Sequence, residues 1–156
     1  MIKIEKGMLR DLGELASIEV KAQEFPLDML GVKDYIESPN KMVFIAKIGD
    51  RIVGHLLLGF SNEDSCAIVA RLSVHPLFRN LKIGNKLLAI GSKTAFVKKL
   101  GSLRISVPSY KMEDREDPYY LKDWLAKERF KAVAVVDREY ARYGTRYDAY
   151  VFERPA

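Results

Sequence analysis

One stretch of the sequence, residues 70–88, carries most of the residues that could do chemistry. In this stretch an apolar run ends, a short loop follows and a long helical pattern begins at once. The first turn of a helix presents unpaired backbone N–H groups and the positive end of the helix dipole, and both favour a bound phosphate. Gly84, near the start of this helix, would let a ligand approach the backbone closely. The pattern therefore indicates a candidate phosphate site.

Basic side chains accompany this candidate site. Lys82, Lys86 and Lys93 fall within about 40° of one another on a helical wheel, where they could hold a polyphosphate. A solvated lysine face at the start of an ordinary strand–helix unit explains these lysines equally well. The sequence contains neither of the glycine-rich phosphate-binding patterns, GxGxxG and GxxxxGK(S/T). These residues alone leave both interpretations open.

The single cysteine and the two histidines do not predict a nucleophile or a metal site. Cys66 precedes three apolar residues, so we expect a buried, inert thiol in a reducing compartment. His55 lies within an apolar run, where a structural role is expected, and His75 stands before Pro76 in a loop. Because this spacing matches no set of metal ligands, we expect no metal.

A regular alternation of strands and helices must position these residues. Hydrophobic periodicity predicts the order β-α-α-β-β-β-α-β-α-β-β, which indicates an α/β domain with a mixed central sheet flanked by helices. The expected strands span residues 1–5, 42–46, 51–60, 66–75, 103–107, 132–136 and 147–152. The expected helices span residues 12–22, 28–37, 82–99 and 120–130. Residues 110–117 and 137–146 are expected to be loops.

The clearest helical pattern, residues 82–99, has an apolar stripe that we expect to face the core. Its members are Ile83, Leu87, Ile90, Thr94 and Val97. Gly101 is expected to end this helix.

Length and composition describe an ordinary globular chain. With 156 residues, 48% hydrophobic and 30% charged, we expect a single domain spanning residues 1–156. The net charge of +5 favours an anionic partner, but the basic residues form no run with interleaved aromatics, so we expect no nucleic-acid binding. No apolar run approaches the ~20 residues of a membrane span, and the N-terminal alternation is typical of a strand and not of a signal peptide. We therefore expect a cytoplasmic protein with no membrane partner.

The segment LSVHPLFRNLKIGNKLL resembles motif A of the GNAT acetyltransferase superfamily, in which a strand ends in V-x-P before (Q/R)-x-x-G-x-(G/A). Arg79 matches the first position and Gly84 the last, whereas Lys82 replaces the first motif glycine. The resemblance extends to the segments DLGELASIEVKAQEFP, VFIAKIGDRIVGHLLL, YLKDWLAKERFKAV and RYDAYVFER. The turn at Phe25 and Pro26 is most similar to the ribosomal-protein-alanine N-acetyltransferase branch.

This resemblance implies a GNAT-like fold, acetyl-CoA as co-substrate and a primary amine as acceptor. A protein or peptide N-terminal amine is the first expectation for the acceptor, and lysine or a small amine is the second. The resemblance implies that the strand end lies along the pantetheine arm and that the next loop wraps the pyrophosphate, where we infer that lysines add charge. The expected cofactor-binding residues are Leu72, Ser73, Val74, Arg79, Asn80, Leu81, Lys82, Ile83, Gly84 and Lys86. The expected acceptor contacts are Phe25, Pro26 and Tyr140, for which general packing is the alternative.

The acid–base positions of the family are not matched in this sequence. Ile68 and Ser106 stand at positions where relatives carry a general base. Leu125 stands where many relatives carry a tyrosine that acts as the general acid. We therefore assign no catalytic pair.

Four alternatives remain for the missing acid and base. Ser106 could order a water molecule, and Tyr119 or Tyr120 could protonate the leaving thiolate. The four carboxylates within residues 113–117 could receive a proton or attract a cationic substrate. Otherwise the enzyme uses the neutral fraction of a low-pKa α-amine. The unmatched acid–base positions also permit a CoA-binding module without transferase activity. A basic nucleic-acid or ribosome-associated adaptor is the third alternative.

Overall fold

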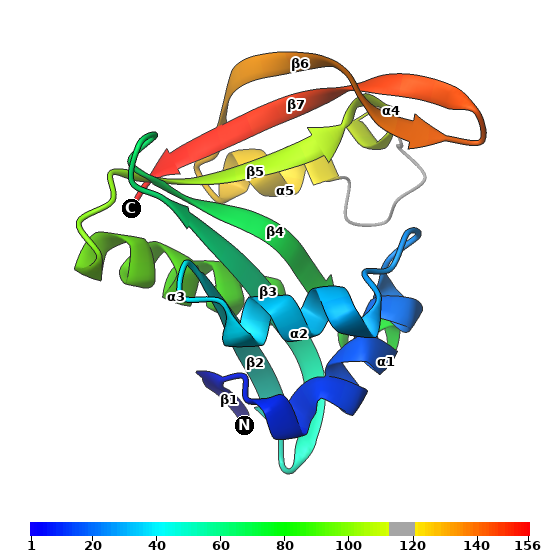
Figure 1. Ribbon diagram of the computed structural model, residues 1–156, viewed down its shortest axis with the longest axis vertical. Helices are drawn as coiled ribbons and strands as arrows, with labels where there is room; N and C mark the ends of the chain where they lie inside the picture. The colour runs from blue at the N-terminus through cyan, green and yellow to red at the C-terminus, as the bar shows by residue number, and fades with distance from the viewer. Residues whose placement is uncertain (113–120) are drawn as a thin grey trace.

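A seven-stranded sheet forms the centre of the fold in this computed structural model, which describes residues 1–112 and 121–156 (Figure 1). The strands are β1 (Ile2–Lys6), β2 (Lys41–Ile48), β3 (Arg51–Ser61), β4 (Cys66–Val74), β5 (Ser102–Pro108), β6 (Lys131–Arg142) and β7 (Thr145–Pro155). Their order in the sheet is β1-β2-β3-β4-β5-β7-β6. β4 and β5 are parallel and all other neighbours are antiparallel, so the predicted mixed sheet is confirmed.

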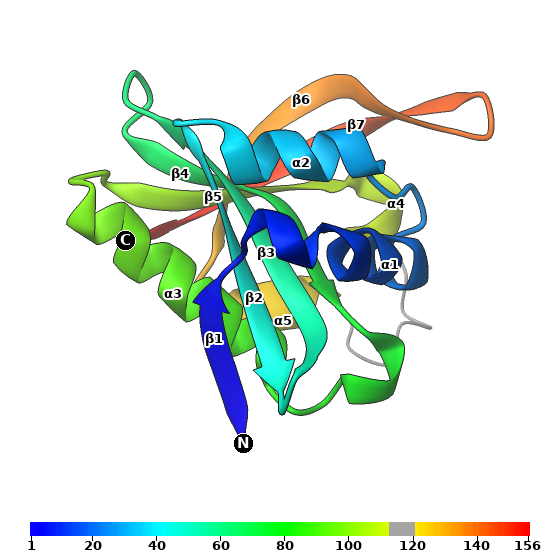
Figure 2. The same cartoon turned by 60° about the horizontal axis from the view of Figure 1, so that its bottom comes forward.

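Helices cover both faces of this sheet (Figure 2). They are α1 (Leu12–Ala22), α2 (Met29–Glu37), α3 (Ile83–Val97), α4 (Ser109–Met112) and α5 (Leu121–Lys127), with short 3₁₀ turns at Leu9–Asp11 and Pro76–Phe78. β3 shows why two layers are needed, because its side chains are buried on both faces. Leu57 packs with α1 and α2, whereas Leu56 and Leu58 pack with α3 and α5. A strand covered on both sides becomes a nearly continuous apolar run, as the sequence of β3 shows.

The buried face of α3 differs from the expected stripe. Val97 is 70% exposed, and Ile90 and Thr94 are only half-buried. The buried members are Ile83, Leu87, Leu88, Gly91 and Ala95. Small residues allow this rotated face to pack closely: a Cβ at Gly91 would lie 3.1 Å from Leu56 Cδ2.

Lys99, and not Gly101, ends α3. Lys99 is in the left-handed conformation, with φ of 62°, and the N–H of Leu100 donates to the carbonyl of Ala95 at 2.9 Å. This is the Schellman arrangement, in which glycine is the commonest but not a required residue.

The expected loops are partly wrong. Residues 137–146 belong mostly to the long β6–β7 hairpin, whose turn is formed by Tyr143 and Gly144 with φ of 50° and 78°. Positive φ at both central residues matches the right-handed twist of the two strands, whereas the charged and tyrosine-rich composition indicated a loop. Residues 109–112 form the short helix α4, and the remainder of the expected loop lies outside the described residues.

A buried arginine attaches the C-terminal strand to two helices. Arg154 of β7 is 7% exposed. Its Nη1 donates to the carbonyl of Glu128 at 3.0 Å, and its Nη2 donates to the carbonyl of Leu88 at 3.1 Å and to Ser92 Oγ at 2.9 Å. The guanidinium therefore holds β7 to α3 and to the end of α5.

Replacing this arginine by lysine should be costly for stability. A lysine ammonium cannot reproduce the planar set of donors, so buried acceptors lose their partners in Arg154→Lys. We expect the free energy of unfolding to fall by about 2–4 kcal/mol in urea titrations. The exposed Arg146→Lys is the matched control and should change it by less than about 0.5 kcal/mol. A similar small change in both variants would contradict the role assigned to Arg154.

Candidate active site

The candidate site lies where two neighbouring strands separate. β4 and β5 pair only over residues 66–69 and 102–105. At this point the pairing of β3 with β4 shifts, because Leu58 pairs with Val69 but Leu57 pairs with Arg71, which leaves Ala70 as a bulge. A bulge bends its strand. The end of β4 therefore leaves β5, and two cavities lie along the separation.

The first cavity, which we call the loop cavity, has a volume of about 560 Å³ and lies between the end of β4 and the start of α3. Eight of the ten residues expected to bind the cofactor line it: Leu72, Ser73, Val74, Arg79, Asn80, Lys82, Ile83 and Gly84. Leu81 and Lys86 are exposed and do not line it. The structure thus brings eight of the ten residues together at one cavity, and their binding of a cofactor stays a prediction.

The backbone of the loop suits an anion. Asn80 and Lys82 have φ of 69° and 58°, which places two residues of this short loop in the left-handed region. Lys82 is the N-cap of α3, and its side chain makes no capping hydrogen bond to the first turn. Consecutive turns of this kind direct backbone N–H groups toward one point, next to the positive end of a long helix. A phosphate would therefore find uncapped N–H donors at the start of α3.

Charge in the loop cavity has one sign. Arg79, Lys82 and Lys127 line it, and no acidic residue does so among the residues that the structure describes. Lys127 and Trp124 come from α5, and the sequence analysis missed them because nothing in the local pattern links α5 to the loop. Their contribution becomes visible only once β5 and α5 are placed beside α3.

The left-handed Lys82 gives a direct test of the loop backbone. A non-glycine residue in this region costs about 1–2 kcal/mol, whereas glycine loses about 0.4–1 kcal/mol more chain entropy on folding. Lys82→Gly should therefore raise the free energy of unfolding by about 0.5 kcal/mol. The control Lys86→Gly, inside α3, should lower it by about 1 kcal/mol. Thermal or urea unfolding measures both, and equal losses would argue against the left-handed conformation.

The second cavity, which we call the hairpin cavity, has a volume of about 390 Å³. It lies between residues 23–25, the ends of β4 and β5, and the β6–β7 hairpin, and it includes Phe25, Ser106 and Tyr140. Pro26 is exposed and does not line it. The hydroxyl of Tyr140 donates to the carbonyl oxygen of Ser106 at 3.3 Å. Tyr119, Tyr120 and the carboxylates of residues 113–117 lie outside the described residues.

Two tyrosine hydroxyls, those of Tyr110 and Tyr140, are among the proton donors that line the hairpin cavity. Burial raises the pKa of Tyr140 above its ordinary value, and Glu139 adds to this shift. Burial also raises the pKa of Tyr110, with Glu24 adding to the shift and Arg142 opposing it. Both phenols are therefore protonated at neutral pH. Tyr110 was missed by the sequence analysis because residues 110–117 were interpreted as a loop.

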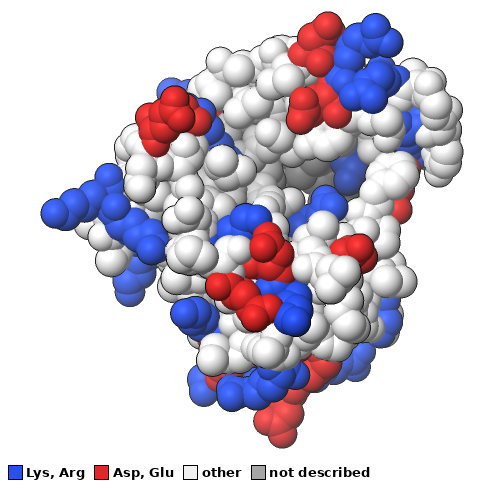
Figure 3. Space-filling view, viewed as in Figure 1, with Lys and Arg blue, Asp and Glu red and all other residues white. Residues whose placement is uncertain are grey.

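The carboxylate at the hairpin cavity is already paired. Arg142 Nε lies 2.7 Å from Glu24 Oε1, and the same guanidinium lies over the Tyr110 ring, 4.4 Å from its centroid. This contact joins the segment after α1 to the β6–β7 hairpin. Figure 3 shows the hollow at the centre of this face with blue side chains at its rim.

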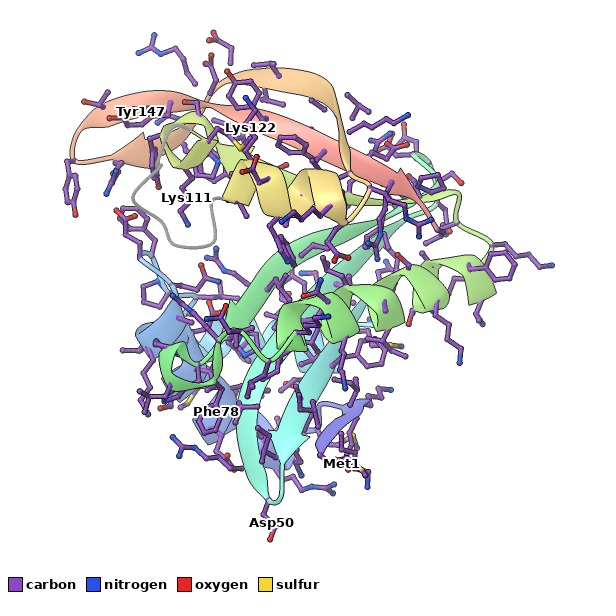
Figure 4. All side chains as sticks on the ribbon, turned by 180° about the vertical axis from the view of Figure 1, so that it is seen from behind. Met1, Asp50, Phe78, Lys111, Lys122 and Tyr147 are labelled. Atoms are coloured by element: carbon purple, nitrogen blue, oxygen red, sulfur yellow. The ribbon has the colours of Figure 1, made fainter. Side chains whose placement is uncertain are left out.

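The two cavities adjoin. Leu72, Leu121 and Trp124 line both of them, so the end of β4 and the first turns of α5 form their common wall. Figure 4 shows the molecule from the side opposite to Figure 3, with Phe78, which lines the loop cavity, and Lys111, which lines the hairpin cavity, both labelled. A molecule in one cavity can therefore reach a molecule in the other.

A buried network supports the common wall from α1. Glu19 is fully buried, and its Oε2 accepts from Ser73 Oγ at 2.9 Å and lies 2.8 Å from His55 Nε2. Gln23 Nε2 donates to Ser73 Oγ at 2.8 Å and to the carbonyl of Leu72 at 3.2 Å. Burial acts to raise the pKa of Glu19, but the hydrogen bonds from its neighbours, His55 first among them, hold it below its ordinary value. The carboxylate is thus ionised and fixes the end of β4.

The single cysteine, Cys66, is buried, and the second histidine, His75, lies in a loop, as their sequence positions indicated. Cys66 is fully buried, and burial raises its thiol pKa. His75 Nδ1 accepts from the N–H of Leu77 at 3.1 Å in the loop before α3. Within residues 1–112 and 121–156, no group of three or more histidine, cysteine, aspartate and glutamate side chains could hold a metal ion.

Fold and site together place a basic cavity at the start of α3 next to a tyrosine-lined cavity, and the two meet at the end of β4. Comparison of the sequence with protein families identifies the class: residues 10–108 match the model of the acetyltransferase (GNAT) family. Since the match covers more than half of the chain, the protein belongs to the GNAT acetyltransferases, and the expected GNAT fold is confirmed.

Solved structures of acetyltransferases share this fold at low sequence identity. The ribosomal-protein-S18-alanine N-acetyltransferase of Escherichia coli has a TM-score of 0.80 at 15% identity, covering 99% of this chain and 94% of that one. NAA60 of Arabidopsis thaliana in complex with a bisubstrate analogue has a TM-score of 0.80 at 14% identity, covering 99% and 98%. A probable acetyltransferase of Staphylococcus epidermidis has a TM-score of 0.82 at 14% identity, covering 99% of both chains. Among curated protein sequences there is no significant match.

Of the helices in the described parts of the chain, none has the length and apolar character needed to cross a membrane.

Proposed function

We propose that this protein transfers the acetyl group of acetyl-CoA to the N-terminal amine of a protein or peptide. The observation that carries the proposal is the junction of the two cavities at Leu72, Leu121 and Trp124. One cavity is basic and opens on the uncapped start of a helix, and the other is lined by tyrosine hydroxyls. A donor and an acceptor held in these cavities meet end to end.

The loop cavity fits the nucleotide end of acetyl-CoA. Backbone N–H groups around Asn80, Lys82 and Gly84 would hold the pyrophosphate, and Arg79 and Lys127 would add positive charge. A cradle exists at Gly84, where an added Cβ would face Trp124 and Leu72 across the cavity. When bound, acetyl-CoA supplies an activated acetyl thioester, for which positioning provides much of the rate.

The hairpin cavity supplies proton donors but no free base among the described residues that line it. Its ionisable members are Glu24, Arg71, Tyr110, Lys111 and Tyr140. Glu24 is paired with Arg142, and the two tyrosines hold their protons at Oη at neutral pH. They can therefore donate to a developing thiolate or carbonyl oxygen, but they cannot deprotonate an ammonium group.

The absence of a free base in this lining favours an α-amine as acceptor. At pH 7 about 10% of an α-amine with a pKa near 8 is neutral, against roughly 0.04% of a lysine with a pKa near 10.4. The difference favours an N-terminus by about two hundredfold before any contact is considered. Two of the solved neighbours, named for a ribosomal-protein alanine, support the same acceptor class. Lysine or a small amine is the second candidate.

Two measurements, made one after the other, test the proposal. Acetyl-CoA at about 100 times its Kd should raise the free energy of unfolding by about 2.7 kcal/mol, and a much smaller rise would exclude the cofactor. Thiol release is then followed with a peptide bearing a free N-terminus, an N-terminally blocked lysine peptide and a polyamine. Release with the first and little with the others is expected. Tight binding without release from any acceptor would identify a CoA-binding module instead.

The pH dependence of the rate separates the two amine classes. Because only the neutral amine is a nucleophile, kcat/KM should rise about tenfold per pH unit for a free N-terminus and level off near pH 8. For the blocked lysine peptide the rise should continue to about pH 10. The tyrosine donors stay protonated through the first range because their pKa values are raised. A plateau below about pH 7 with both peptides would reveal a base on the enzyme and contradict this account.

A further inference from the structure

β6 is the outer strand of the sheet and is unusually exposed. It pairs with β7 on one side and is last in the strand order, so within residues 1–112 and 121–156 no strand lies beside its other edge (Figure 1). Residues 131–139 are exposed without interruption, on both faces of the strand. Among them Val133 is 53% exposed, Val135 58% and Val136 40%. An apolar edge of this kind has free backbone groups and β-branched side chains suited to pairing with another strand.

Little in the sequence of β6 protects this edge. Folded proteins usually block an edge strand with charged side chains, proline, a covering element or a bulge. Residues 132–136 contain no charge and no proline. The pairing with β7 shifts register twice, at Val133 and between Val136 and Tyr140, and only residues 134–136 between these shifts continue the ladder regularly. Figure 3 shows a mostly uncharged surface over the first part of β6, with red and blue side chains gathered farther along the strand.

The residues of this edge are complementary to those of a second, antiparallel copy of the same strand. The sequence K-A-V-A-V-V-D, residues 131–137, has Ala134 at its centre. If a second copy of the strand lies antiparallel with a two-fold axis at Ala134, Val133 faces Val135 of the second copy. Lys131 then faces Asp137 of the second copy, and the symmetry repeats each pair. Opposite charges directly across an antiparallel pair are stabilising, and like charges are destabilising.

Both charges are available for such a contact. Within the part of the chain that the structure describes, neither Lys131 nor Asp137 forms an ion pair. The carboxylate beside Lys131 on β7, that of Glu153, is held by Arg104 at 2.6 Å.

From the exposed edge and its charge pattern, we propose that β6 pairs with β6 of a second copy of this chain, antiparallel about a two-fold axis at Ala134. The pairing joins the two sheets into one continuous sheet. It leaves the loop cavity of each copy open, because that cavity lies on β4, α3 and α5. The occupant is a second copy, and not an unrelated strand, because the edge matches itself in charge.

Charge reversal tests both the contact and its register. Sedimentation of the unmodified chain, from micromolar to several hundred micromolar, should show a monomer–dimer equilibrium. Lys131→Glu and Asp137→Lys should each raise the dimer Kd by about tenfold or more, since two pairs per dimer change from attraction to repulsion. An equal mixture of the two variants should dimerise as the unmodified chain does. In the mixed dimer every opposed pair again joins opposite charges.

The outcomes are separable from those of the acetyltransferase assay. Val135→Lys places a charge in the middle of the edge and should give a monomer that still binds acetyl-CoA, which shows that it is folded. A chain that stays monomeric at all concentrations would overturn the proposal and leave the edge to a different strand partner. A dimer that neither reversal weakens, or that the mixture does not restore, would also overturn it.

Discussion

Gly84→Val should abolish acetyl-CoA binding while the chain remains folded. An added Cβ at Gly84 would lie 3.5 Å from Trp124 Cζ2 and 3.9 Å from Leu72 Cδ2, which are ordinary van der Waals distances. The protein alone therefore accepts alanine here. The two further methyl groups of valine extend into the loop cavity, at the point where the first N–H groups of α3 would meet the pyrophosphate. We expect the Kd for acetyl-CoA to rise more than about a hundredfold, equivalent to about 2.7 kcal/mol.

A matched control exists at the same position of another helix. Gly13 is the second residue of α1, as Gly84 is of α3, and a Cβ there would meet nothing within 4 Å. Gly13→Val therefore carries the same helix propensity change without entering a cavity. Calorimetric titration of both variants with acetyl-CoA, with circular dichroism as the check on folding, measures the effect. Unaltered affinity in Gly84→Val would place the pyrophosphate elsewhere on the molecule.

Most residues that line the loop cavity could be singled out from the sequence because they are close together in it. Its residues come mainly from one strand end, one loop and one helix start, all within residues 72–84, and each has a recognisable pattern. The exception is instructive. Lys82 stands where the motif has a glycine, and it adopts the left-handed conformation that glycine favours.

The hairpin cavity could not be predicted in the same way. Its tyrosines, Tyr110 and Tyr140, lie 30 positions apart, and they meet only because β5 pairs with β7 and β7 with β6. Neither α4 nor the extension of β6 past Val136 gave a strong periodic signal, since both are short or rich in charge. The side chains that position an acceptor therefore depend on tertiary pairing that a one-dimensional pattern does not contain.

The same limit applies to the network beneath β4. Glu19 appears in the sequence as one of several charged residues of a surface helix, and His55 as a polar interruption of an apolar strand. Both side chains are fully buried, and each is a polar partner of the other at 2.8 Å. A buried charge is tolerated only with partners, so this pair could be inferred only after α1 had been placed over β3 and β4.

Glu19→Gln should be the most destabilising single change in this region. Glu19 Oε1 accepts from the N–H of Leu27 at 2.9 Å and lies 3.2 Å from Arg71 Nε, while Oε2 faces His55 and Ser73. An amide turns one of these acceptors into a donor that opposes other donors. Removing the charge from a buried pair typically costs about 3–5 kcal/mol, and we expect a loss of this size in urea unfolding at pH 7. Glu14→Gln, on the same helix, is the control: Glu14 is exposed and accepts from the Ile52 N–H at 3.2 Å, so the loss should be less than about 1 kcal/mol.

The acid branch of the stability profile identifies the carboxylate itself. Hydrogen bonds lower the pKa of folded Glu19 below its unfolded value, so its contribution to stability is present above the unfolded pKa, about 4.3, and is lost as the pH falls through the folded pKa. Between pH 7 and the acid limit the unmodified chain should therefore lose more stability than Glu19→Gln, and the two curves should converge. Parallel curves would show that Glu19 is not ionised in the native state. Glu19 accepts a hydrogen bond from Ser73, and Gln23 donates to both Ser73 and the carbonyl of Leu72. Because these contacts connect Glu19 to the wall of the loop cavity, the variant should also bind acetyl-CoA more weakly under conditions in which it remains folded.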